Sequence, residues 1–131
     1  MNIGLIAHDN KKKLMENVCI AYRHILCKHS LFATSTTGRL IEDAANLTVH
    51  KYLTSRLGGE QQLGAQIANN DLDVMIFFRD PIYQKDYEAE MNSIFHLCDI
   101  HNIPLATNLA TAEALLLALN RGDLDWRNVV K

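Results

Sequence analysis

The sequence predicts an α/β protein with a doubly wound, five-stranded parallel sheet that carries helices on both faces. Three observations point to this fold class. Five short apolar runs are spread over the 131 residues, amphipathic stretches separate most of them, and each run ends in polar residues. Strands that alternate with helices form parallel sheets covered on both faces, and their crossovers are right-handed.

Each of the five apolar runs is short enough to be a buried strand. They are Asn2–Ala7, Leu31–Ala33, Val49–Tyr52, Asp73–Phe78 and Pro104–Thr107. The third run is the least regular, because His50 and Lys51 interrupt its apolar pattern. We therefore expect five strands in this order along the chain.

The stretches between these runs have the spacing of amphipathic helices. In the first stretch, Leu14, Val18 and Tyr22 recur along one face. The expected helices are Lys11–Lys28, Thr37–Ala45, Gln61–Asn69, Glu88–His101 and Thr111–Leu119. The last helix is apolar nearly throughout, so we expect other structure to cover it, and Gly122 is suited to end it.

The composition excludes several classes of protein. A chain of 131 residues with 48% hydrophobic residues can bury a core of its own, so residues 1–131 are expected to form one domain. The net charge of -2 argues against a general nucleic-acid binder, and no apolar run is long enough to span a membrane. The chain opens directly into the first strand, without a signal-peptide pattern, which predicts a cytoplasmic protein.

The cysteines and histidines give no sign of a disulfide or a metal site. Cys19, Cys27 and Cys98 are odd in number and form no Cys-x-x-Cys pair. They are expected to be small core residues in a reducing compartment. The six histidines show no metal-ligand spacing. We therefore expect no metal site.

Polar side chains follow every expected strand. In open α/β sheets, ligands bind beyond the carboxyl ends of the strands. In strand order, the residues at these ends are His8, Asp9 and Lys12, then Thr34–Gly38, then Thr54–Glu60, then Arg79–Pro81, and finally Asn108. This clustering places the predicted binding site at that edge of the sheet.

The segment Thr34-Ser35-Thr36-Thr37-Gly38 has the features of a phosphate-binding loop. It leads directly into an expected helix, whose first N–H groups and dipole attract an anion. A helix cap needs a single threonine, whereas this segment offers four consecutive hydroxyl groups. Lys12 would add a positive charge. The segment is not a Walker sequence, because the Gly-x-x-x-x-Gly-Lys pattern is missing.

Three other residues at the strand ends have a structural explanation beside a functional one. His8, at the end of a buried strand, could be structural or catalytic, and its charged neighbours leave the two about equally supported. Glu60 could be an ordinary carboxylate in the first turn of a helix, or a general base. Asp80 precedes a proline, where an aspartate commonly starts a turn.

Together, these strand-end segments resemble the methylglyoxal synthase family. The matching segments are Leu5–Asp9, Lys12, Ala33–Gly38, Gly58–Gly64, Val74–Pro81 and Asn102–Asn108. They follow the family's order at close to its spacing, and the resemblance covers nearly the whole chain. Several segments in register are much more specific than any one of them.

The resemblance implies a homohexameric enzyme that converts dihydroxyacetone phosphate to methylglyoxal and inorganic phosphate, without metal or cofactor. In this family a carboxylate removes a proton next to the carbonyl, a histidine hydrogen-bonds the enediolate, and phosphate leaves. By this match Glu60 is the base, His8 contacts the substrate oxygens and Asp80 orders the site. The expected phosphate-binding residues are Lys12, Thr34, Ser35, Thr36, Thr37 and Ser55, with Asp9, Gly38 and Thr54 beside them.

The chain departs from the family pattern around the reacting centre. The family has an aspartate where this chain has Glu60, so the expected base is one methylene longer. Tyr87 replaces a family histidine and Glu90 replaces an aspartate; both are kept as expected catalytic residues, and Tyr87 also as a substrate contact. A tyrosine can donate to an oxyanion, but it titrates near pH 10 and is a poor proton shuttle. Arg127 lies where the family has a substrate-contacting arginine, but in no recognisable motif.

Three functions fit this pattern of an intact phosphate-binding half and an altered proton-transfer half. The first is a methylglyoxal synthase, whose activity the substitutions could weaken. The second is a non-catalytic sensor of phosphorylated metabolites, since the same fold serves as the regulatory domain of carbamoyl phosphate synthetase. The third is a lyase or isomerase that acts on another phosphorylated ketose.

Overall fold

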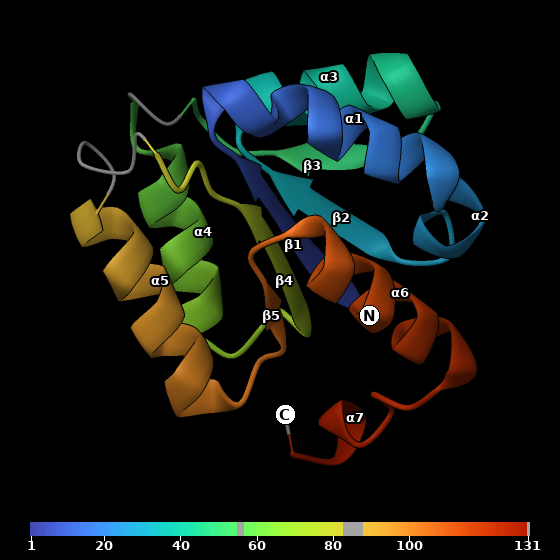
Figure 1. Ribbon diagram of the computed structural model, residues 1–131. Coiled ribbons are helices and arrows are strands. Elements are labelled where there is room, and N and C mark those ends of the chain that lie inside the picture. The colour runs from blue at the N-terminus through green and yellow to red at the C-terminus, as the bar shows by residue number, and fades with distance from the viewer. Residues whose placement is uncertain (55–56, 83–87, 131) are drawn as a thin grey trace.

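The computed structural model describes residues 1–54, 57–82 and 88–130. Its centre is a five-stranded sheet in the order β3-β2-β1-β4-β5, and every neighbouring pair of strands is parallel. The strands are β1 (Asn2–Ala7), β2 (Ser30–Ala33), β3 (Val49–Lys51), β4 (Val74–Phe78) and β5 (Leu105–Ala106) (Figure 1). The predicted fold class is confirmed, and the five strands lie within two residues of their expected ends.

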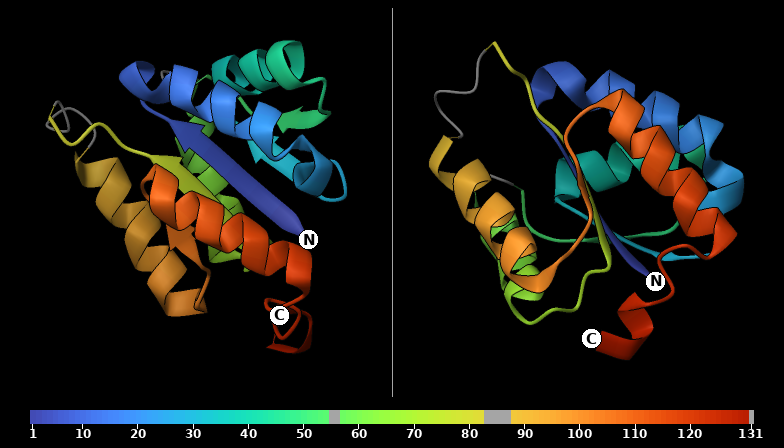
Figure 2. Two further views of the ribbon diagram at one scale, coloured as in Figure 1. Left: turned by 45° about the vertical axis from the view of Figure 1, so that its right-hand side comes forward. Right: turned by 60° about the horizontal axis from the view of Figure 1, so that its bottom comes forward.

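The helices cover both faces of the sheet (Figures 1 and 2). One face carries α1 (Lys12–Ala21), α3 (Ser35–Ala45) and α6 (Leu109–Arg121), and the other carries α4 (Gly59–Ala68) and α5 (Glu88–His101). The short elements are η1 (Asp9–Lys11), α2 (Arg23–Leu26) and α7 (Arg127–Val130). Figure 2 shows α7 close to the N-terminus, at the amino end of β1.

Successive residues of β1 face two separate cores. Ile3 and Leu5 pack with the α1, α3 and α6 side, whereas Ile6 packs with the α4 and α5 side. This alternation follows from the two-residue period of a strand, and burial on both faces explains the nearly unbroken apolar runs. Gly4 lies between them, where a Cβ atom would come within 2.7 Å of the Met75 sulfur. Glycine at this position therefore lets Met75 fill the second core.

Four of the five helix predictions need correction; two of them are α4 and α6, which begin at Gly59 and Leu109, two residues before their expected starts. The predicted helix Lys11–Lys28 is divided at Tyr22, whose φ of -109° and ψ of 22° are not helical; the bend turns the fully buried Ile25 and Leu26 into the core. The helix expected from Thr37 begins at Ser35. Among the described residues the last helix is covered on one side only: Ala112, Leu116 and Leu119 are buried, whereas Leu117 on its outer face is 46% exposed.

Two further differences concern the amino end of the sheet. Cys19 and Cys98 are buried as expected, but Cys27 is exposed, because it lies just after α2 has ended. The short helix α7 was not predicted, because its four residues are too few to show an amphipathic repeat.

Candidate functional site

His8 and Asp80 lie side by side at the carboxyl ends of the two central strands. His8 directly follows β1, and its backbone N–H donates to the carbonyl of Phe78 at the end of β4 over 3.1 Å. The backbone N–H of Asp80 donates to His8 Nδ1 over 2.8 Å, and both residues are buried. An Nδ1 atom that accepts a hydrogen bond carries no proton, so a neutral His8 holds its proton on Nε2. The fold thus fixes the tautomer of a buried histidine.

The carboxylate of Asp80 is held from two directions. Its Oδ1 atom accepts from the backbone N–H of Ile82 over 2.9 Å, which is the turn that the Asp-Pro pair predicts. Its Oδ2 atom accepts from the side chain of Asn10 over 2.8 Å. Asn10 was not among the predicted site residues, because an exposed residue in a turn shows no pattern that links it to a strand end seventy positions later.

The predicted phosphate-binding segment is the first turn of α3, and not a loop before it. Thr34 has extended backbone angles (φ -61°, ψ 157°) and is the N-cap residue, and within the described part of the chain its side chain makes no capping hydrogen bond. Ser35, Thr36 and Thr37 therefore place hydroxyl groups around helix N–H groups that lack intrahelical partners. This correction strengthens the prediction of an anion site, because the dipole and the hydroxyl groups act at one point.

Lys12 joins this helix turn to the end of β1. Its Nζ atom donates to the carbonyl of Ala7 and to Thr37 Oγ1, over 3.1 Å in each case. The carboxylate of Asp9 lies 3.8 Å from the same Nζ atom, and the Asp9 side chain is 85% exposed. The Lys12 side chain is 20% exposed, so its charge lies at the sheet edge within reach of a ligand. The structure thus brings Lys12 to Thr37 as predicted, with Asp9 at the rim.

The N-terminus of α4 packs directly against the N-terminus of α3. A Cβ atom on Gly59 would lie 1.9 Å from the Leu53 carbonyl oxygen and 3.1 Å from Thr34 Cγ2. The Gly59 N–H also donates to the carbonyl of Thr54 over 2.9 Å. Only glycine allows this close approach. Glu60 is the next residue along α4, so its backbone lies next to the residue that contacts the hydroxyl-rich turn.

The remaining predicted residues differ in how far they can be placed. Ser55 and Tyr87 lie outside the described residues. Glu90 is the third residue of α5, and Glu60 the second residue of α4. Gly38 is buried against Lys51 in the first turns of α3, where its N–H donates to the Thr34 carbonyl and closes the helix.

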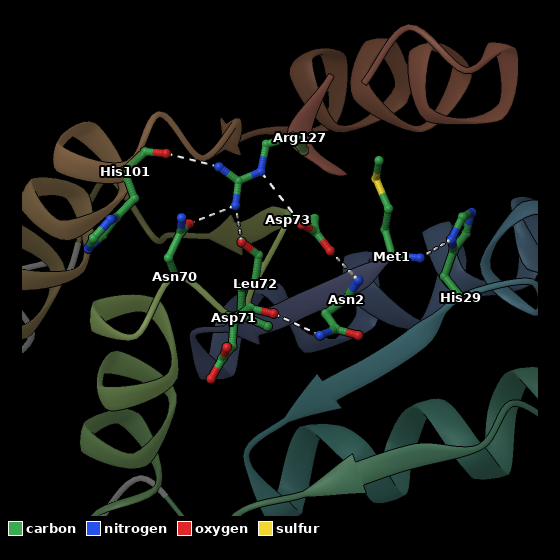
Figure 3. A network of polar contacts seen from close by, with 9 residues as sticks. All are labelled: Met1, Asn2, His29, Asn70, Asp71, Leu72, Asp73, His101 and Arg127. Atoms are coloured by element: carbon green, nitrogen blue, oxygen red, sulfur yellow. Dashed lines mark hydrogen bonds and ion pairs between the residues drawn. The ribbon is translucent and has the colours of Figure 1, made fainter. Parts of the chain in front are cut away.

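Arg127 does not lie at this edge of the sheet. Its guanidinium is fully buried at the opposite, amino edge (Figure 3). It donates to the carbonyls of His101 and Leu72 and to the side chain of Asn70, over 2.8–2.9 Å. Arg127 of this chain therefore cannot be the substrate-contacting arginine of the same subunit's site.

The fifth strand ends in a cap instead of a ligand contact. Asn108 is the N-cap of α6, and its Oδ1 atom accepts from the N–H of Thr111 over 3.1 Å. Asn108 also lines a cavity of about 390 Å³ with Lys11 and Arg79, beside the site but on the α1 and α6 face. Within residues 1–54, 57–82 and 88–130, no three His, Cys, Asp or Glu side chains are grouped to hold a metal ion.

A search for membrane-spanning helices in the described part of the chain finds none that is long and apolar enough.

Comparisons with known proteins agree with this geometry. Residues 16–107 match the family model of the MGS-like domain. Methylglyoxal synthase from Caldicellulosiruptor saccharolyticus is 58% identical over 130 residues, covering 99% of this chain and 92% of that protein. The corresponding protein from Alkaliphilus metalliredigens is 55% identical over 131 residues, covering all of this chain and 98% of that protein.

A solved structure shows the same fold. The crystal structure of methylglyoxal synthase from Elizabethkingia anophelis superposes with a TM-score of 0.79 at 39% sequence identity, covering 88% of this chain and 76% of that one. Both the sequence identity and the shared fold therefore point to the same group of proteins. The chain belongs to the methylglyoxal synthase family.

Proposed function

We propose that this chain converts dihydroxyacetone phosphate to methylglyoxal and inorganic phosphate, with Glu60 as the base and His8 as the main contact of the substrate oxygens. The observation that carries the proposal is the contact of Gly59 with Thr34 and Leu53. This close approach brings the start of α4, which carries Glu60, next to the first turn of α3, and it supports the proposal that this turn binds the phosphate of the substrate. A phosphorylated substrate held by the turn would present its carbon skeleton to both Glu60 and His8.

The first step is a proton transfer from carbon. Glu60 takes a proton from the hydroxymethyl carbon next to the carbonyl, and the C–H electron pair forms the enediolate. Negative charge then develops on the former carbonyl oxygen, where a hydrogen-bond donor stabilises the transition state. His8 is suited to this role, because Asp80 keeps its proton on Nε2. A neutral imidazole can donate that proton and recover it without leaving its place.

The second step breaks the carbon–oxygen bond to the phosphate. The hydroxyl group on the deprotonated carbon gives its proton to His8 Nε2, which has donated its own proton to the former carbonyl oxygen, and its oxygen forms the aldehyde C=O. The carbon–carbon double bond then shifts to the carbon that carries the phosphate, and the bond from that carbon to the phosphate oxygen breaks. The resulting enol becomes methylglyoxal by proton transfer from oxygen to carbon. Lys12 and the hydroxyl and N–H groups of Thr34–Thr37 stabilise the phosphate, which gains charge as it leaves. Ser55 and Thr54 complete the expected phosphate contacts, and Tyr87 and Glu90 remain the proposed additional catalytic groups.

We further propose that residues 1–131 act as one domain within a cytoplasmic homo-oligomer, a hexamer as the family resemblance implies. Large apolar side chains at the C-terminal end support an association of subunits. Trp126 is 45% exposed, Val129 is 85% exposed and Val130 is 61% exposed, which is unusual for side chains that stay in water. Sedimentation or light scattering of the purified protein tests this proposal.

The test of function is an assay of purified protein with dihydroxyacetone phosphate that follows methylglyoxal and phosphate release together. We expect both products in equal amounts from the wild type. Glu60→Gln keeps the size of the side chain but removes the base, and it should lower kcat by about a thousandfold or more. Tight binding of the ester without release of either product would contradict the proposal and favour the sensor hypothesis.

A double variant tests the assignment of the altered residues. Glu60→Asp, Tyr87→His restores the family's residues at two positions, and we expect its kcat to rise, since both positions would then carry the family's proton-transfer groups. A loss of activity in the double variant would show that the match of these positions to the family pattern is wrong.

A further inference from the structure

We propose that Asn10 is a positioning residue that keeps the proton of His8 on Nε2 by holding Asp80 in place. The proposal rests on the proposed function, since it concerns the histidine that would contact the substrate oxygens. No sequence motif drew attention to Asn10. Its role follows from the hydrogen bonds that join the first turn after β1 to the residues after β4.

Three hydrogen bonds connect the segments 8–10 and 78–80, and together they form a closed clamp. The His8 N–H donates to the Phe78 carbonyl over 3.1 Å, and the Asp80 N–H donates to His8 Nδ1 over 2.8 Å. The Asn10 side chain then donates back to Asp80 Oδ2 over 2.8 Å. Asp80 thus donates to one residue of the turn and accepts from another two positions later.

The clamp constrains the direction of the Asp80 N–H. With the Ile82 N–H on Oδ1 and the Asn10 amide on Oδ2, both carboxylate oxygens of Asp80 are held. Rotation of the side chain would also disturb the adjoining turn and the N–H that faces His8. Without the Asn10 donor, the imidazole of His8 could take a proton on Nδ1 and present a lone pair to the substrate in place of a donor.

The chemistry of the position favours a neutral amide. Asn10 is exposed, whereas Asp80 is 5% exposed, so the amide donates to a buried carboxylate from the solvent side. Hydrogen bonds to charged groups are stronger than those between neutral groups. A donor without a net charge stabilises the Asp80 carboxylate and leaves the positive charge of Lys12 for the anion site, where it contacts Thr37.

Asn10→Ala removes the donor with little other change. We expect kcat to fall about tenfold, while KM changes less than about twofold, because the phosphate-binding turn of α3 is untouched. Nitrogen-15 spectra of the histidines in the free protein should show His8 in the Nε2–H tautomer in the wild type and a mixture of tautomers in the variant. These spectra require no turnover, so they test the clamp even if the proposed reaction fails.

Asn10→Asp gives a pH-dependent form of the same test. At pH 8 the introduced carboxylate faces the Asp80 carboxylate, and the repulsion should lower kcat further than Asn10→Ala does. As the pH falls and the pair takes up one proton, an O–H group can donate to Asp80, so the ratio of variant to wild-type kcat should rise. The other charged or titratable groups near the pair are His8, Asp9, Lys11, Lys12 and Arg79. Their own effects on kcat are common to both proteins, whereas the attraction of the cations to the introduced carboxylate moves the rise of the ratio to lower pH without removing it.

Asn69→Asp is the matched control, because Asn69 is exposed at the far end of α4 and the charge change is the same. It should leave kcat and the His8 spectrum unchanged. A merely structural role of Asn10 would lower the melting temperature but would give a flat kcat ratio with pH and an unaltered tautomer. That result, or an Asn10→Ala variant with wild-type kcat and spectrum, would overturn the proposal.

Discussion

The two edges of the sheet both collect charged side chains, but they use them differently. At the amino edge, the Arg127 and Asp73 side chains are 0% exposed, and the Arg127 Nε atom lies 3.6 Å from Asp73 Oδ1. At the carboxyl edge, the Lys12 side chain keeps 20% of its surface exposed beside an Asp9 side chain that is 85% exposed. The ionic groups of the amino edge are buried from solvent, whereas those of the carboxyl edge remain accessible to it.

The partners of the two cations explain this difference. The Arg127 guanidinium bonds two backbone carbonyls and an amide oxygen, which ties α7 to the loop before β4 and to the end of α5 (Figure 3). Asp73 in turn accepts from the N–H of Asn2 at the start of β1 over 2.8 Å. Lys12 also contacts a backbone carbonyl, that of Ala7, but its other contact is a hydroxyl group in the first turn of a helix. A cation beside a helix N-terminus favours the binding of an anion. A cation whose hydrogen bonds are taken up by carbonyl groups of its own chain stabilises the fold instead.

The largest effect is expected from breaking the amino edge. Arg127→Ala leaves Asp73 buried without its cation and frees the carbonyls of His101 and Leu72, so the free energy of unfolding should fall by about 3–5 kcal/mol. Urea denaturation measures this change. The control is Arg121→Ala, which breaks an exposed ion pair to Asp123 and should cost less than about 1 kcal/mol. Equal losses in the two variants would contradict the structural role of Arg127.

The carboxyl edge is tested next by two glycines of the same helix. Gly59→Ala forces a Cβ atom into the Leu53 carbonyl, so the start of α4 must move and carry Glu60 with it. A displacement of about 1 Å should lower kcat/KM on the order of 100-fold. Gly64→Ala meets no atom within 4 Å and should keep full activity, with the helix stabilised by about 0.5–1 kcal/mol.

Steady-state kinetics and thermal melting of the two glycine variants separate these effects. A Gly59→Ala protein that retains wild-type kcat/KM would show that Glu60 does not depend on the contact between the starts of α3 and α4.

A smaller effect is expected from removing the exposed cation of the carboxyl edge. Lys12→Met keeps most of the length of the side chain but loses the charge near Thr37, so KM for a phosphate ester should rise about tenfold. Lys13→Met is the neighbouring control, since its Nζ atom pairs only with Glu16 among the described residues and its side chain is 80% exposed. Inhibition by inorganic phosphate should weaken in the first variant alone.

Most of the fold follows from the sequence because its strands are buried on both faces. Continuous apolar runs such as Val74–Phe78 are readily recognised as buried strands. Because these runs alternate with helices, only a few orders of the strands in the sheet are possible. The ends of helices are harder to predict, because they depend on contacts made elsewhere. In the structure, α3 begins at Ser35 because Thr34 has an extended backbone and is the N-cap residue. Four hydroxyl-bearing residues in a row could each be the cap, so the sequence does not show which of them precedes the first turn.

The sequence predicts those residues of the candidate site that directly follow a strand. It does not predict residues whose role depends on a contact with a distant part of the chain. His8, Lys12 and Asp80 were expected at one edge because each lies just beyond a buried run, and the structure places them there. Asn10 and Arg127 show the limit of this approach. The role of each depends on a partner about sixty to seventy residues away, which no local pattern encodes.

The smallest effect is expected on the reactivity of the cysteine thiols. Whether a buried thiol reacts with an added reagent shows whether the amino edge stays closed to solvent. Burial raises the pKa of the Cys98 thiol to about 12, and Asp99 adds to the shift, so about one thiol in ten thousand is ionised at pH 8. Cys27 is exposed. Iodoacetamide at pH 8 should therefore modify Cys27 and leave Cys98 intact, with no loss of activity, since both thiols lie far from the carboxyl edge. Mass spectrometry of the modified peptides measures this selectivity. In Arg127→Ala the loss of the nearby cation raises the pKa of Cys98, but solvent reaching the thiol past the loosened α7 removes burial, the larger cause of its raised pKa, so Cys98 should react as well. Protection of Cys98 in that variant would show that the amino edge closes without its buried cation.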